Sequence, residues 1–171
     1  MTSRELLIVR HAKSDWSNNL ASDIERPLNS RGEKDAPKIA KWIHSQQIVP
    51  DALLCSPARR AKQTANAIIE ELKLPDTSVA FDKRLYLASL STLLAVIAEL
   101  GDSVKTVMLV GHNPGLEELI FKLCDDHLPF AESGKLLTTA NVVMLQFNCD
   151  WQNIGNTQGK LLHFIRPRDL S

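Results

Sequence analysis

The sequence has few cysteines and no excess of charge of either sign. Its 171 residues include only Cys55, Cys124 and Cys149, an odd number with no Cys-x-x-Cys pair. This usage argues against a disulfide framework and against a zinc site, so a reduced, cytoplasmic protein is the default expectation. Lys plus Arg and Asp plus Glu each number 20, which gives a formal net charge of zero. Without a basic surplus, neither a nucleic acid nor a membrane is expected as a partner.

Long hydrophobic runs are also missing. Apolar residues 6–9 lead directly into charged residues, unlike the apolar region of a signal peptide. The longest apolar stretch, residues 85–100, contains Ser and Thr and falls short of the ~18 residues that a spanning helix needs. The chain also lacks internal repeats, low-complexity tracts and linkers, so residues 1–171 are predicted to form one domain.

Short apolar runs alternate with amphipathic segments along the chain. Strands are predicted at residues 5–9, 52–55, 78–82, 106–110, 141–147 and 160–165, and helices at 32–47, 57–74, 90–100 and 114–124. Such alternation is typical of an α/β fold with a mostly parallel central sheet and helices on both faces, a three-layer sandwich. The exception to the short connections is residues 13–31, a long polar segment of the kind that is usually functional or mobile.

Prolines mark several of the predicted helix starts. Ser56 is expected to be an N-cap with Pro57 as the first helical residue, and Asn113 with Pro114 is expected to cap a later helix. Pro37 is expected near the first turn of the first helix. Free amides at helix N-termini attract anions, so these starts favour an anion site.

Two arginines and two histidines follow predicted strands. Arg10 and His11 close the first strand, Arg60 lies one turn beyond the second, and His112 follows the fourth. Ligands of open parallel sheets bind outside the carboxyl ends of the strands, so these groups meet if the three strands are neighbours. Guanidinium groups match phosphate oxygens, and a neutral imidazole can attack phosphorus. Arg10 is expected to lower the pKa of His11 and keep its ring neutral, so the pattern predicts phosphoryl chemistry.

A cysteine-based phosphate loop is disfavoured at residues 55–60. Cysteine-dependent phosphatases have an arginine six positions after the cysteine, but here that residue is Ala61, and the segment lacks the glycines that wrap a phosphate. Cys55 is therefore expected to be a small core residue. Of the two arginines in this segment, Arg60 lies somewhat nearer than Arg59 to the apolar stripe of its helix, so Arg59 is the expected solvated residue.

Three motifs resemble, in order, the signatures of the histidine phosphatase superfamily, whose members share the phosphoglycerate mutase-like fold. They are RHAKSDW (10–16), SPARRAKQTA (56–65) and LVGHNPGLEEL (109–119). The segments ERPLNSRGEKDA (25–36) and HFIRPRDL (163–170) are similar to short SixA-type members, which are phosphohistidine phosphatases. The resemblance covers nearly the whole chain.

This resemblance implies roles for particular residues. His11 would be the nucleophile that becomes phosphorylated, and Arg10, Arg60 and His112 would bind the phosphoryl group and stabilise its transfer. Arg26 would be a further substrate contact from the long loop. No metal or organic cofactor is implied.

The sequence departs from the family pattern in two ways. Ala12 stands where the first signature usually has glycine, and both of the family's general acids are missing: residues 81–89 contain no glutamate, and the residue after the second histidine is Asn113. An alkyl ester must expel an alkoxide, whereas phosphohistidine expels an imidazole that water can protonate cheaply. The missing acid therefore favours a phosphorus–nitrogen bond.

The acid could still come from Asp15, Asp82 or Tyr86. The expected function is a metal-independent phosphatase acting on phosphohistidine in a signalling or phosphotransfer protein. The alternatives are a phosphomonoesterase for a small phosphorylated substrate and a phosphate-recognising module without turnover. A monomer is expected in each case.

Overall fold

The computed structural model describes residues 3–17 and 21–170, so residues 18–20 of the predicted long loop lie outside the described part. Within it, a six-stranded sheet has the order β3-β2-β4-β1-β5-β6. The strands are β1 (Arg4–Arg10), β2 (Ala52–Cys55), β3 (Val79–Phe81), β4 (Thr106–Gly111), β5 (Val142–Phe147) and β6 (Lys160–Ile165). The first four are parallel to their neighbours among themselves, and β5 and β6 are antiparallel. The predicted mostly parallel sheet is confirmed.

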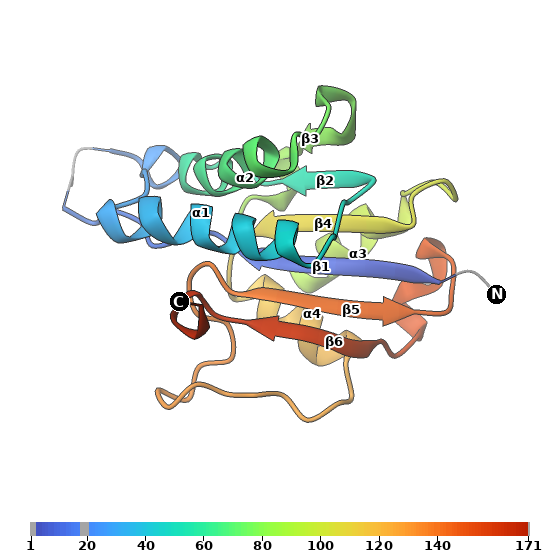
Figure 1. Ribbon diagram of the computed structural model, residues 1–171. Helices are drawn as coiled ribbons and strands as arrows, with labels where there is room; N and C mark the ends of the chain where they lie inside the picture. The colour runs from blue at the N-terminus through green and yellow to red at the C-terminus, as the bar shows by residue number, and fades with distance from the viewer. Residues whose placement is uncertain (1–2, 18–20, 171) are drawn as a thin grey trace.

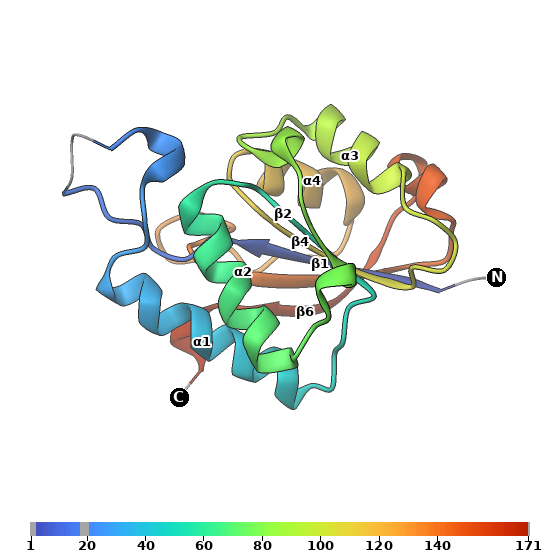
Figure 2. The ribbon, with the colours of Figure 1, turned by 90° about the horizontal axis from the view of Figure 1, so that it is seen from above.

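Helices cover both faces of the sheet (Figures 1 and 2). α1 (Ser30–Ser45) and α2 (Arg59–Leu72) lie on one face, and α3 (Leu90–Ala98) and α4 (Gly115–Leu123) lie on the other. β1 supplies both cores: Leu6 and Ile8 pack with the α3 and α4 side, whereas Leu7 and Val9 pack with the α1 and α2 side. A strand buried on both faces needs apolar residues at consecutive positions, which explains the run at its centre.

The helix starts differ from the prediction in three places. α2 begins at Arg59 with Ala58 as its N-cap, so Ser56 and Pro57 precede the helix instead of opening it. α4 begins at Gly115, with Pro114 in the N-cap position after a cis peptide bond. In both segments the chain makes an additional turn after the strand, and that turn belongs to the site described below.

The first helix begins two residues before the predicted start. Asn29 caps it by accepting a hydrogen bond from the Gly32 amide at 2.9 Å, and Pro37 lies in the middle of the helix instead of near the first turn. A Cβ at Gly32 would clash with the Lys13 carbonyl oxygen. This close approach lays the chain that leaves β1 directly against the start of α1.

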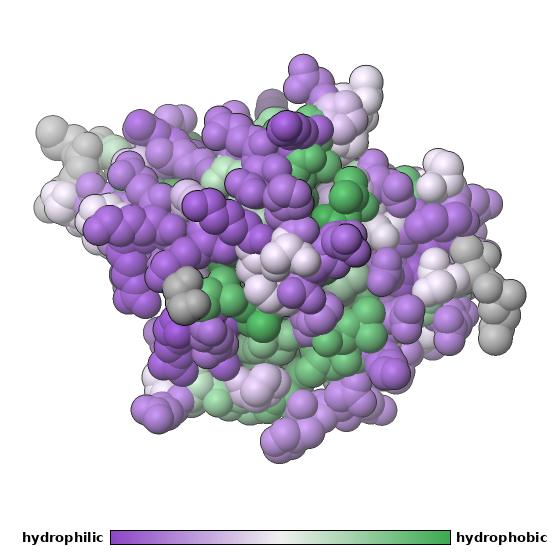
Figure 3. Space-filling model, in the orientation of Figure 1, coloured by the Kyte–Doolittle hydropathy of each residue, from purple (hydrophilic) through white to green (hydrophobic). Residues whose placement is uncertain are grey.

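The outer surface is mostly hydrophilic on the face that carries α1 and α2. Hydrophobic side chains gather on its lower half, where Figure 1 shows β5 and β6 without a covering helix (Figure 3). In the described part of the chain, every helix is too short or too polar to cross a bilayer.

Candidate active site

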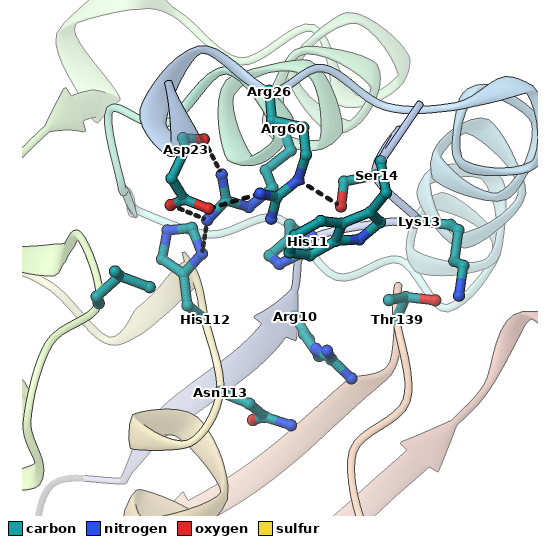
Figure 4. Close-up of a pocket in the computed structure, with 12 residues that line it drawn as sticks. Arg10, His11, Lys13, Ser14, Asp23, Arg26, Arg60, His112, Asn113 and Thr139 are labelled. Atoms are coloured by element: carbon teal, nitrogen blue, oxygen red, sulfur yellow. Dashed lines mark hydrogen bonds and ion pairs between the residues drawn. The ribbon is translucent and has the colours of Figure 1, made fainter. Parts of the chain in front are cut away.

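All five predicted site residues line one cavity of about 300 Å³ at the carboxyl ends of β1 and β4 (Figure 4). These residues were expected to meet if their three strands are neighbours, and β2, β4 and β1 are indeed adjacent in the sheet. Arg10 and His11 arrive from β1, His112 from β4, and Arg60 from the first turn of α2. Arg26 reaches the same cavity from the long loop.

The His11 ring is fixed in one tautomer by its neighbour. Its Nδ1 lies 2.7 Å from the Ala12 carbonyl oxygen. A carbonyl can only accept, so in the neutral ring the proton is on Nδ1 and the lone pair is on Nε2. The Ala12 amide in turn donates to Thr64 Oγ1 at 2.9 Å, which ties this turn to α2. The ring nitrogen available to attack an electrophile is therefore Nε2.

His112 has the opposite tautomer. Its Nδ1 lies 3.4 Å from Nη2 of Arg60, and its Nε2 lies 2.7 Å from Ser56 Oγ. A guanidinium can only donate, so Nδ1 carries the lone pair and Nε2–H donates to Ser56. Ser56, predicted as a helix cap, thus orients the second histidine. The centroids of the His11 and His112 rings are 5.1 Å apart.

Both imidazoles are held neutral, and the chief cause is burial. Burial lowers the pKa of His11 to about 3, with smaller contributions from His112, Arg60 and Arg10. Burial followed by the charge of Arg60 lowers the pKa of His112 to about 4. The predicted direction for His11 agrees with this, and Arg10 lowers the pKa as predicted, but only as a minor cause. Arg10 contributes least, because removal of the ring from water dominates.

Asp23 also belongs to the site, although no sequence motif indicated it. This residue lies on η1 (Asp23–Glu25), inside the long loop. Its carbonyl oxygen accepts from Arg60 Nη1 at 2.6 Å, and its Oδ2 accepts from Arg60 Nη2 at 3.0 Å. Its Oδ1 accepts from Arg26 Nη1 at 2.6 Å, and the Tyr86 hydroxyl donates to Oδ2. Asp23 therefore links both arginines with Tyr86 over the cavity.

Asp23 is an anion in this arrangement. Although burial acts to raise it, hydrogen bonds from Tyr86, Arg60 and Arg26 hold the pKa of Asp23 well below its usual range. Burial and the hydrogen bond to Asp23 raise the pKa of Tyr86, so its hydroxyl stays protonated. The arrangement explains why the buried Arg60 side chain carries no uncompensated charge.

Arg10 is bound to the segment that precedes β5. Its Nη1 donates to the Leu137 carbonyl at 2.9 Å, which Asn113 Nδ2 also contacts at 3.1 Å. The Leu137 amide donates to Glu117 at 2.9 Å. The segment before β5 is thus anchored by α4 and by the end of β1, and Arg10 is held with it. Asn113, predicted as a helix cap, acts as one of these anchors.

Two of the predicted candidates for the general acid, Asp15 and Asp82, do not line the cavity. Asp15 accepts hydrogen bonds from Ser17, and Asp82 is bound to Arg84. Cys55 is buried, and burial raises the pKa of its thiol, as expected for a core residue. Among residues 3–17 and 21–170, no group of three or more His, Cys, Asp or Glu side chains is arranged to hold a metal ion.

We expect His11 to stay uncharged well below neutral pH. A lowered pKa means that the imidazolium is disfavoured, so the ring gains its proton only as the pH falls towards about 3. NMR titration of histidine labelled with ¹³C, assigned with His11→Asn, should show no protonation of this ring between about pH 8 and pH 5. A midpoint near the ordinary value of about 6.5 would contradict the burial argument.

Comparison with known proteins adds to this geometry. The family model described as histidine phosphatase superfamily (branch 1) matches residues 6–86. An uncharacterized protein of Mycobacterium tuberculosis is 31% identical over 165 residues, which cover 94% of this chain and 100% of the relative.

SixA proteins are similar in both sequence and structure. Phosphohistidine phosphatase SixA of Escherichia coli is 27% identical over 126 residues, covering 73% of this chain and 77% of SixA. A crystal structure from Agrobacterium tumefaciens, assigned as phosphohistidine phosphatase SixA, superimposes with a TM-score of 0.79 at 28% identity and covers 96% of this chain and 99% of that one. The predicted α/β fold is confirmed, and these relatives support a phosphatase activity. The predicted family is confirmed as well, and the chain belongs to the histidine phosphatase superfamily.

Proposed function

We propose that this chain is a metal-independent phosphatase that removes the phosphoryl group from phosphohistidine in a protein, through a phosphorylated His11. One observation carries the proposal: a buried, neutral His11 has its Nε2 lone pair free in a cavity that is also lined by Arg10, Arg60 and His112. An anion-binding module has no need for a neutral imidazole among its cations.

In the first step, the Nε2 lone pair of His11 attacks phosphorus and forms a new phosphorus–nitrogen bond. The bond to the substrate imidazole breaks, and its nitrogen keeps the electron pair. Arg10 and Arg60 bind the non-bridging oxygens, over which the charge of the transferring group is spread. The Ala12 carbonyl oxygen, which accepts the hydrogen bond from Nδ1–H of His11, stabilises the positive charge that develops on the ring.

In the second step, water attacks the phosphorus of phosphorylated His11. The His11–phosphorus bond breaks, its electron pair returns to Nε2, and the water proton passes to solvent. The products are inorganic phosphate and the neutral histidine. Because the first step exchanges one phosphorus–nitrogen bond for another, it needs little driving force from the protein.

The absence of a free acid favours phosphohistidine over an alkyl ester. Among the described residues that line the cavity, Asp23 is the one carboxyl group, and its hydrogen bonds keep it ionised. The Tyr86 hydroxyl already donates its hydrogen bond to that carboxylate. Neither group is poised to protonate an alkoxide, whereas a departing imidazole can take its proton from water.

The similarity to SixA supports the same substrate class, since its Escherichia coli relative carries the name phosphohistidine phosphatase. The proposal includes a cytoplasmic location, which is consistent with Cys55, Cys124 and Cys149 all being free thiols.

The substrate class can be tested by comparing two kinds of bond. A phosphohistidine peptide should be hydrolysed with a kcat/KM at least about 100-fold above that of glucose 6-phosphate, since acid catalysis typically contributes 10²–10⁴-fold to ester cleavage. Phosphate release would be measured for both substrates, with His11→Asn as the background. Equal or faster hydrolysis of the sugar phosphate would favour a small-molecule phosphomonoesterase instead.

A further inference from the structure

Two exposed apolar side chains stand at the rim of the cavity. Trp16 follows β1 in the long loop, and Leu87 lies between β3 and α3. Trp16 is 70% exposed and Leu87 is 55% exposed, yet both line the cavity whose floor holds the histidines. Large apolar groups exposed at a polar site need an explanation, because water disfavours them there.

Trp16 is held in place by Arg26. The Arg26 guanidinium lies 3.6 Å from the centroid of the Trp16 ring, a close cation–π contact. Arg26 is itself fixed by Ser14 Oγ at 3.2 Å and by Asp23 Oδ1 at 2.6 Å, and its side chain is only 11% exposed. The indole is therefore backed by a fixed guanidinium while most of the ring remains open to solvent.

Leu87 is held outward by its backbone. It has a φ of 50°, in the left-handed region that a branched side chain rarely occupies. The residue before it, Tyr86, is tied to Asp23 by its hydroxyl, and the carbonyl of Ala88 packs so closely on Gly115 that a Cβ there would clash. Both neighbours are fixed, so the unfavourable conformation persists and keeps Leu87 at the rim.

The cavity is larger than a phosphoryl group needs. A volume of about 300 Å³ lies at the small end of the range for pockets that enclose organic ligands. Bound between Arg10, Arg60 and His112, the phosphoryl group would occupy the floor, and the leaving group would extend past the rim. An uncharged planar ring is the leaving group that best matches an open indole and an aliphatic side chain.

We infer that Trp16 is a specificity-determining residue, against which the imidazole of the substrate phosphohistidine stacks as it leaves, with Leu87 contacting the adjoining part of the peptide. This inference rests on the proposed function. Stacking of this ring on the indole orients the phosphorus–nitrogen bond away from His11, as an in-line displacement requires. Trp16 takes no part in phosphoryl transfer to His11. Its role is limited to binding and orienting the leaving group.

The test uses two substrates with the same kind of bond, a phosphohistidine peptide and phosphoramidate, which has no ring. Trp16→Ala should lower kcat/KM on the peptide by about fivefold to tenfold, mostly through KM, as expected for loss of one aromatic contact. It should leave kcat/KM on phosphoramidate unchanged. Trp16→Phe should restore most of the peptide activity, and Leu87→Ala should cause a smaller, peptide-specific loss of about threefold.

Phe130→Ala is the matched control. Phe130 is an exposed aromatic residue, 54% accessible, that stacks on Phe121 instead of lining the cavity. It should affect neither substrate. Equal losses on both substrates with Trp16→Ala would overturn the inference, because they would indicate that Trp16 merely positions Arg26; no loss on either would overturn it too. Failure of the wild type to hydrolyse either phosphorus–nitrogen substrate would instead contradict the proposed function itself.

Discussion

His11→Asn is expected to abolish both turnover and covalent labelling of the protein. Asparagine keeps a polar side chain near the Ala12 carbonyl but supplies no nucleophilic nitrogen, so neither step of the reaction can proceed. Loss of a covalent nucleophile commonly costs about 10⁴-fold or more in kcat. Rapid acid-free quenching with phosphohistidine labelled with ³²P, followed by denaturing electrophoresis, should show an acid-labile phosphoprotein for the wild type and none for the variant.

His44→Asn provides the control for this experiment. His44 is exposed on α1 and lies 2.8 Å from Glu71, away from the cavity. The variant should label and turn over like the wild type. Turnover that persists in His11→Asn, or labelling that moves to another residue, would contradict the assignment of the nucleophile.

The second large effect is expected at Arg60. Its two terminal nitrogens form a fork that already spans Asp23 and His112, and the side chain is only 2% exposed. Arg60→Lys keeps a positive charge but offers a single nitrogen, so bidentate binding of the phosphoryl oxygens is lost. We expect kcat/KM to fall by about 10²–10³-fold, the typical cost of removing one preorganised donor to transition-state charge.

The neighbouring residue supplies the control. Arg59 is exposed, and Arg59→Lys should change kcat/KM little. Both variants should be compared with the wild type by circular dichroism and thermal unfolding, so that a folding defect is distinguished from a catalytic one. A normally folded Arg60→Lys variant with undiminished kcat/KM would contradict the role of the guanidinium fork.

Much of the fold could be predicted because its strands are buried on both faces. β1 and β4 carry consecutive apolar residues that feed two cores at once, and such runs can be recognised without knowledge of their partners. The placement of His11 and His112 then follows from topology, since each residue directly follows one of two adjacent parallel strands. The preference for Arg60 over Arg59 as the buried arginine also follows from the helical stripe.

The rest of the site depends on irregular backbone, which lacks the regular spacing of apolar residues by which helices and strands can be predicted. Asp23 lies in a short 3₁₀ turn of the long loop and approaches Arg60 only because the loop folds back over α2. Ser56 is suited to capping by its chemistry, but the chain turns once more before α2 and directs the hydroxyl to His112. The main cause of the low His11 pKa was also inaccessible, because burial is a property of the packed structure.

The ion pair between Asp23 and Arg60 bears on how substrate binds and how phosphate leaves the cavity. In the proposed reaction, we expect a phosphoryl group that enters the cavity to take donors of Arg60 that the Asp23 carboxylate now holds, so that the buried guanidinium always has an anionic partner. Free phosphate must compete with that built-in counterion after each turnover. We therefore expect the return of the Asp23 carboxylate to Arg60 to assist release of the product.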